Sequence, residues 1–239
     1  SAWVGPRSFS YLGSGAPSVS TTSAINVTST SATLRGIVSS NGSATTVYFI
    51  WGVGAAVGNS VDAAESPLAS TASSVTVNGN ISGLTAGTTY YYRIHASNTD
   101  GTASGTELSF TTSRLNQTAL TVNDPGTVTF GTSPTLTTSG GSGTGAVTFS
   151  ASGTGCSVGA STGVLTITNA SGTCSITATK AGDTTYNPTT SAARSITMAK
   201  ASQTITATVD TDPVVYGTTA TLGSSGSSGT GAVTYSSGA

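Results

Sequence analysis

The chain has 239 residues, of which only 6% are charged, and its net charge at pH 7 is −1. So small a charge gives no electrostatic basis for binding nucleic acid or an anionic membrane surface, and neither is predicted as a partner. No run of 18 apolar residues occurs, so no membrane insertion is predicted in this segment. Ser and Thr together supply 88 residues and Gly 31, while Met, Lys and Glu are scarce. Because Thr is β-branched and favours strands, the composition predicts an all-β fold.

Residues 1–16, SAWVGPRSFSYLGSGA, are similar in pattern to LSFTTSRLNQT at 108–118. We interpret them as a leftover strand or linker of a preceding domain, or as a strand packed on the domain that follows. Ser1 is not Met, and no charged start with an apolar core follows it. The sequence therefore predicts a processed product or an excerpt of a longer chain.

Residues 17–113 contain strands in which apolar and polar residues alternate, as expected of half-buried strands. In SATLRGIVSSNGSATTVYFIWG, two apolar sets share an inward face. They are Ala32, Leu34 and Val38, followed by Val47, Phe49 and Trp51.

The later stretch LTAGTTYYYRIHASNTDG resembles the fibronectin type III pattern L-x-P-G-T-x-Y-x-x-R-x-x-A-x-N-x-x-G, with Ala86 in place of the usual Pro. The matching residues are Leu84, Gly87, Thr88, Tyr90, Arg93, Ala96, Asn98 and Gly101. The resemblance spans 17–113 and implies a seven-stranded sandwich. It also implies that Tyr90 is a corner tyrosine whose hydroxyl bonds nearby backbone; ordinary core packing is the alternative for this side chain.

Two residues in VYFIWG have no obvious place in such a sandwich. Tyr48 and Ile50 lie on the face opposite Val47 and Phe49, so both faces of this strand are apolar. They predict either a contact surface or a face covered by a local loop at about 53–70.

Residues 114–199 show the same period of two in GAVTFSAS, GVLTITN and TCSITATK. The chain has only two cysteines, Cys156 and Cys174, and both take inward parity. With one His they are too few for a zinc site, and no CxxC motif occurs. They predict a buried structural disulfide, and hence an oxidising compartment, with two free buried thiols as the alternative.

Residues 200–239 repeat the beginning of that unit. The stretch from Asn116 matches the stretch from Ser202 at an offset of 86 residues, without a gap. This indicates a duplicated module, complete over 114–199 and only begun over 200–239, with linkers at Ser113–Gln117 and Ala199–Gln203. Val233 and Tyr235 would lie on an open core face. Either the natural chain continues, or strands of another chain complete the module.

Both copies resemble the bacterial immunoglobulin-like repeats of long surface proteins. The resemblance rests on QTITATVDTDPVVYGTTATL, GTGAVTYSS, GTCSITATKAGDTTYNP and the paired Cys. The predicted fold is therefore all-β, with tandem immunoglobulin-like and fibronectin type III-like sandwiches in a rod whose last repeat is incomplete.

No catalytic, cofactor-binding or metal-binding residues are predicted. The single histidine, His95, is expected on an outward sheet face as a solvated side chain, and the eight acidic residues are dispersed. The sequence thus predicts a non-enzymatic stalk of a secreted, adhesin-like bacterial surface protein. Its partners would be other domains of the array or neighbouring copies. The alternatives are a protomer of an extracellular filament joined by strand complementation, and a spacer in a secreted carbohydrate-active enzyme.

Overall fold

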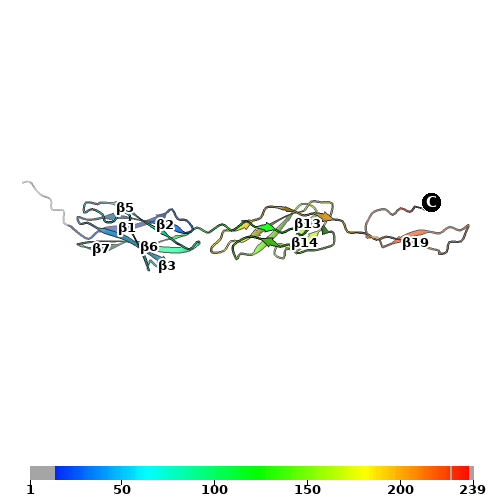
Figure 1. The fold of residues 1–239 in the computed structure, drawn as a ribbon, viewed down its shortest axis with the longest axis horizontal. Helices are drawn as coiled ribbons and strands as arrows, with labels where there is room; N and C mark the ends of the chain where they lie inside the picture. Colours follow the sequence, from blue (N-terminus) through cyan, green and yellow to red (C-terminus); the bar gives the residue numbers. More distant parts are fainter. Residues whose placement is uncertain (1–13, 57, 227, 237–239) are drawn as a thin grey trace, which may run out of the picture. The chain divides into compact units, whose positions relative to one another are not determined.

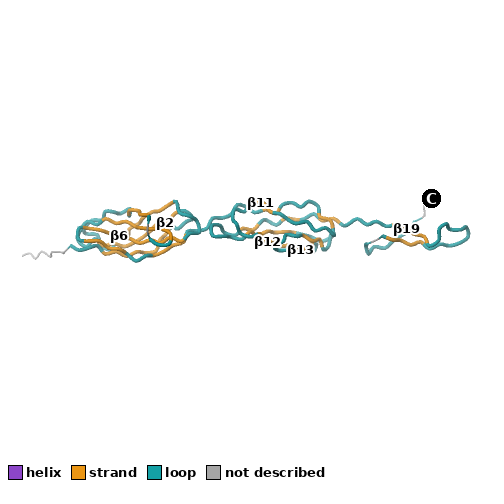
Figure 2. The backbone as a smooth tube through the Cα atoms, turned by 90° about the horizontal axis from the view of Figure 1, so that it is seen from below, coloured by secondary structure: helices purple, strands orange, loops and turns teal. Residues whose placement is uncertain are grey.

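The structure is a computed structural model that describes residues 14–56, 58–226 and 228–236. Within these ranges it contains strands, turns and loops but no helix, as Figures 1 and 2 show. This confirms the all-β class. No helix in the described part of the chain could therefore cross a lipid bilayer. Residues 1–13 of the predicted N-terminal strand lie outside the described residues.

Eight strands lie between Ser18 and Thr111. They are β1 (Ser18–Ile25), β2 (Ser31–Ser39), β3 (Thr46–Val53), β4 (Asn59–Asp62), β5 (Val75–Ser82), β6 (Thr89–Asn98), β7 (Gly101–Ser104) and β8 (Leu108–Thr111).

The strands after Thr111 are shorter. Over 114–199 they are β9 (Thr121–Val122), β10 (Val128–Thr129), β11 (Thr138–Ser139), β12 (Val147–Ser152), β13 (Cys156–Val158), β14 (Leu165–Ile167), β15 (Ser175–Lys180), β16 (Thr189–Thr190), β17 (Arg194–Ser195) and β18 (Met198–Ala199). Two more follow: β19 (Thr206–Val209) and β20 (Leu222–Ser225).

The first eight strands form two antiparallel sheets that share one hydrophobic core. One sheet has the order β1-β2-β5, and the other has the order β4-β3-β6-β7 with β8 also paired to β6. Core residues come from both, including Leu34 and Val77 of the first sheet and Phe49, Tyr92 and Ile94 of the second. Burial of this apolar surface is the main favourable term in folding.

The predicted inward parities are confirmed in this part of the chain. Ala32, Leu34 and Val38 are buried, and so are Val47 and Phe49. Trp51 is half-buried, and its ring meets Tyr90 edge-on at 5.8 Å.

Gly36 explains how closely the two sheets approach. A Cβ on Gly36 would lie 2.5 Å from Cδ1 of Ile94, so a side chain at this position of β2 would collide with β6.

Two segments next to the predicted domains, the end of 1–16 and the predicted linker Ser113–Gln117, are hydrogen-bonded to strands or loops of the described chain. Asn41 donates from Nδ2 to the carbonyl of Ala16 at 2.8 Å, so this end of the 1–16 segment packs on the strands that follow. Leu115, inside the predicted linker Ser113–Gln117, pairs with Tyr186, and its N–H donates to the carbonyl of Thr185 at 2.8 Å. An extended segment beside an unpaired strand edge can satisfy its backbone N–H and C=O groups by pairing with that edge. This explains why Leu115 is held in place.

The segment 114–199 is built from several small sheets. β12, β15 and β16 form one sheet with β17 also paired to β15, while β9 pairs with β11 and β13 with β14. β10 and β18 pair in parallel, with Val128 beside Met198. Of the residues with inward parity here, Leu165, Ile167, Cys174, Ile176 and Ala178 are buried. Val147, Phe149, Cys156 and Val158 are only half-buried.

The remaining strands, β19 and β20, form an antiparallel pair of their own. Val233 and Tyr235 lie outside any strand.

By its internal packing the described chain divides into two compact units. One takes in the chain up to Leu120 together with Gly140–Val147 and Thr179–Thr190, and the other takes in the remainder. The domain limits read from the sequence, 17–113, 114–199 and 200–239, stay predictions.

Candidate interaction surface and structural sites

The outer face of the β4-β3-β6-β7 sheet gathers the half-buried side chains that the sequence singled out. In the antiparallel pair of β3 and β6, Tyr48 lies opposite His95 and Ile50 opposite Arg93. Directly opposite residues share a face, so these four side chains lie together, away from the buried Phe49 and Ile94. Tyr91 follows on the same face opposite Gly52, and we call the five side chains the outer patch: Tyr48, Ile50, Tyr91, Arg93 and His95.

His95 lies on the outward face of the sheet, as predicted, but it is half-buried within the outer patch and not freely solvated. Its ring stacks on Tyr48 with centroids 5.3 Å apart and an interplanar angle of 11°. Its Nδ1 lies 2.9 Å from the Ser104 hydroxyl. Partial burial, and secondarily the charge of Arg93, lower the pKa of His95 below its usual value. Within the described residues, the Ser104 hydroxyl is the hydrogen-bond partner of the imidazole, and no carboxylate bonds the ring.

Tyr48 and Ile50 are half-buried, which suits either alternative that the sequence left open. Tyr and Arg are enriched at protein interfaces, and the outer patch carries both. Its role as a contact surface stays a prediction.

The two cysteines form a disulfide, with their Cα atoms 5.5 Å apart, an ordinary separation for such a bond. Cys156 lies in β13 opposite Ile167 of β14, and the buried Cys174 directly precedes β15. The bridge therefore ties the β13–β14 pair to the start of β15. Cys156 is only half-buried, as is Val158 at the other end of β13.

Tyr90 makes the backbone contact expected of a corner tyrosine. Its hydroxyl accepts a hydrogen bond from the N–H of Thr85 at 2.9 Å. Its ring is buried and lies 5.7 Å from that of Phe110. The hydrogen bond from Thr85 thus ties the segment that precedes β6 to a residue of β6.

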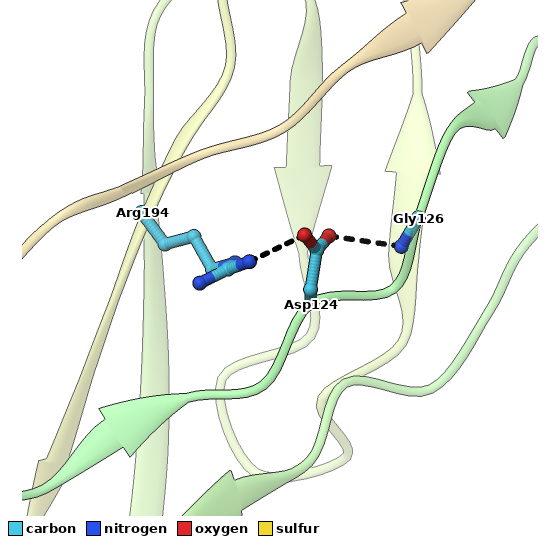
Figure 3. Close-up of polar contacts among 3 residues, drawn as sticks. All are labelled: Asp124, Gly126 and Arg194. Atoms are coloured by element: carbon cyan, nitrogen blue, oxygen red, sulfur yellow. Dashed lines mark hydrogen bonds and ion pairs between the residues drawn. The ribbon is translucent and has the colours of Figure 1, made fainter.

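Figure 3 shows a polar site that the sequence did not single out. Asp124 accepts a hydrogen bond from the N–H of Gly126 at 2.9 Å and forms an ion pair with Arg194 of β17. The Gly126 amide and then Arg194 lower the pKa of Asp124. Asp124 and Arg194 are 70 residues apart in the sequence, so no local spacing could have revealed the pair.

Asp183 holds a turn through hydrogen bonds from backbone amides. Its carboxylate accepts hydrogen bonds from the backbone N–H groups of Thr144, Thr185 and Tyr186. These bonds lower its pKa to about 2. Hydrogen bonds from several backbone N–H groups favour the charged form of a carboxylate, which accounts for so low a value.

No group of three or more His, Cys, Asp or Glu able to hold a metal ion occurs within residues 14–56, 58–226 and 228–236.

Val233 and Tyr235 are 39% and 45% exposed. Their counterparts in the first copy, Val147 and Phe149, are half-buried in β12.

Comparison with known proteins adds little. No family model matches the chain, and no curated protein matches it. The solved structures that resemble it include two of the sensor domain of the anti-sigma factor RsgI4 in Pseudobacteroides cellulosolvens. The shorter is 20% identical, with a TM-score of 0.30, and covers 41% of this chain and 96% of its own. The longer is 18% identical, with a TM-score of 0.30, and covers 42% and 92%. Likeness at this level carries no argument about function.

Proposed function

We propose that the chain is a non-enzymatic structural segment, the stalk or shaft of a secreted bacterial surface protein. The observation that carries this proposal is the duplication. Gly131 and Gly217 have φ angles of 88° and 86°, and Gly140 and Gly226 have 82° and 88°. The same turns thus recur at the same offset in both copies. A chain that repeats one β unit gains length by addition of units, which is what a stalk requires.

The disulfide supports an extracellular setting for this segment. Bridges of this kind persist in oxidising compartments and are rare in the cytosol of mesophiles. A bridge that pins short strands also suits a module with little core of its own.

The finer assignment of the modules belongs to the same proposal. Two sheets sharing one core, together with the Tyr90–Thr85 contact, support a fibronectin type III-like sandwich over 17–113. The Cys156–Cys174 bridge and the repeated strands support an immunoglobulin-like unit over 114–199.

Small-angle X-ray scattering of the full chain tests the proposal. A compact globule of this length has a radius of gyration of roughly 18 Å, and an unfolded chain roughly 53 Å. A tandem array predicts an intermediate value with a long tail in the pair-distance distribution and a Kratky plot that shows folded modules. A radius near the compact value would contradict a stalk.

A further inference from the structure

The turn that leads into β6 lies against a loop from much further along the chain. Gly87 has a φ angle of 63°, and a Cβ at this position would overlap the carbonyl oxygen of Thr184. Both residues belong to the compact unit that takes in the chain up to Leu120 together with Thr179–Thr190. We call residues 85–88 the β6 turn and residues 183–187 the opposing loop. Only glycine suits position 87, because a side chain would collide with the backbone of the opposing loop and strain the positive φ.

The opposing loop has a shape that does not depend on this contact. The carboxylate of Asp183 accepts hydrogen bonds from three backbone N–H groups, at 2.7 Å from Thr144 and 2.8 Å from both Thr185 and Tyr186. The N–H of Asp183 donates to the carbonyl of Tyr186 at 3.0 Å. A loop that is already ordered loses little further conformational entropy when it makes a contact, so the carbonyl of Thr184 is presented at low cost.

The linker that follows β8 pairs with the opposing loop. The N–H of Leu115 donates to the carbonyl of Thr185, and the N–H of Asn187 donates to the carbonyl of Leu115, both at 2.8 Å. Asn187 also donates from Nδ2 to Oδ1 of Asn116 at 3.0 Å. Gln117 donates from Nε2 to the carbonyl of Asn187 at 2.8 Å. Consecutive linker residues are therefore hydrogen-bonded to the opposing loop, whereas a flexible linker would leave these groups to water.

The start of the linker is fixed to the β6 turn. The N–H of Gly87 donates to the carbonyl of Ser113 at 3.3 Å. The N–H of Thr88 donates to Oγ1 of Thr112 at 2.9 Å, and this hydroxyl donates to the carbonyl of Thr85 at 2.6 Å. Thr112 is buried, so these bonds are shielded from competing water. The β6 turn, the linker and the opposing loop thus meet at Gly87.

We propose that the β6 turn is a docking surface for the opposing loop, and that this contact makes strands β1–β8, the linker and the opposing loop one rigid body. Position 87 sets the fit, because a Cβ there would force the two surfaces apart. The alternative is a flexible joint, which is the usual expectation for modules connected by a short linker. This inference goes beyond the stalk proposal and does not depend on it. The joint can be rigid in a chain that is no stalk, and a stalk can have flexible joints.

Residual dipolar couplings of the backbone amides in the full 239-residue chain test the proposal. We expect the couplings of β2, β5 and β6 and those of residues 115–117 and 183–187 to fit one alignment tensor, because they belong to one rigid body. The quantity compared between variants is the magnitude of the couplings of the opposing loop divided by that of the couplings of β6, which we call the coupling ratio.

Two glycine variants separate the contact from backbone strain. Gly87→Ala introduces the colliding Cβ. Gly83→Ala is the matched control, because Gly83 also has a positive φ, 73°, but a Cβ there meets nothing within 4 Å. We expect Gly87→Ala to lower the coupling ratio roughly twofold and Gly83→Ala to change it by less than about a tenth, because only the first frees the opposing loop to reorient.

A third variant loosens the joint from the linker. Gln117→Ala removes the side chain that donates to the carbonyls of Ala181 and Asn187, and it should lower the coupling ratio while the amide signals of β6 stay unchanged. It decides the question if Gly87→Ala unfolds strands β1–β8, and an unchanged ratio in Gln117→Ala then overturns the proposal. Separate alignment tensors in the unmodified chain would also overturn it. So would an unchanged ratio in a folded Gly87→Ala variant, or equal losses in Gly87→Ala and Gly83→Ala.

Discussion

The two copies of the repeat have similar sequences and similar turns but very different surroundings. Val128 is 3% exposed and its counterpart Val214 is 50% exposed. The conformation of the glycine turns depends on local sequence and is the same in both copies. Burial is not local, since it depends on residues 163–165 and 198 in the first copy. The comparison teaches that the first part of this module encodes its turns and strand pair, while its core requires the second part.

Substitutions at Leu136 and at its counterpart Leu222 should differ most in their effect on the free energy of unfolding. Leu136→Ala should destabilise the 114–199 segment by about 2–5 kcal/mol, because it leaves a cavity in a packed site. The equivalent Leu222→Ala should change stability by less than about 0.5 kcal/mol, since Leu222 is already in solvent. Urea unfolding followed through the amide signals of Leu165 and Ile176 measures the first effect, and the amide signals of Ala207 and Val209 in β19 measure the second. Equal effects of the two variants would show that the exposed copy is in fact packed.

The disulfide should matter only to the complete copy. Replacing both Cys156 and Cys174 with Ala should remove roughly 3 kcal/mol from the 114–199 segment in the chain-entropy model. The strands β1–β8 should keep their stability, because they hold no part of the bridge. Urea unfolding read separately from amides of β6 and β15 checks this. A matched loss in β6 would contradict independent modules, and reduction of the unmodified chain should reproduce the variant.

Asp124 and Asp210 occupy the same position in the two copies and offer a smaller contrast. Both have a lowered pKa, but Asp124 owes part of this to Arg194, whereas Asp210 is bonded chiefly by the N–H of Thr221. Arg194→Gln should raise the pKa of Asp124 toward 3.8 and leave that of Asp210 unchanged.

A lowered folded-state pKa gives stability that is present above the unfolded value of 3.8 and lost as pH falls through the folded value. In the Arg194→Gln variant the contribution of Asp124 should therefore vanish at a higher pH. Carboxyl NMR titration of both residues is the measurement. A shift of the pKa of Asp210 by the same amount would mean that the variant acts globally.

Much of the fold could be predicted because its signals are local. Alternation in the stretches that form β2, β3, β6 and β15 identified the buried side chains, and inward parity identified the disulfide. The register of β19 escaped prediction. Val122 pairs with Thr138 in the first copy, but in the second copy Ala207 pairs with Ser224 where the offset of 86 would place Thr208. The sequence match is gapless because the glycines and Asp210 keep that offset, whereas the strand pairing does not follow it.

The polar sites were less predictable. Tyr90 had a motif, so its contact could be anticipated. Stacking of His95 on Tyr48 depends on which residues of β3 and β6 face each other. The register between two strands distant in sequence cannot be predicted from the sequence of either strand alone. The pairing of Leu115 with Tyr186 was missed for the same reason.

Hydrogen exchange on the full chain tests the central claim most directly, because it compares the two copies within one molecule. The claim is that the first copy is a folded core module and that the second, in the same chain, is an open strand pair. The amides of Asn123 and Leu136, which donate to Thr137 and Gly163, should exchange only by global unfolding of their segment. Those of Thr206–Val209 should exchange orders of magnitude faster, because an isolated two-stranded pair is marginally stable. Equal, strong protection of both copies in the chain alone would contradict the account.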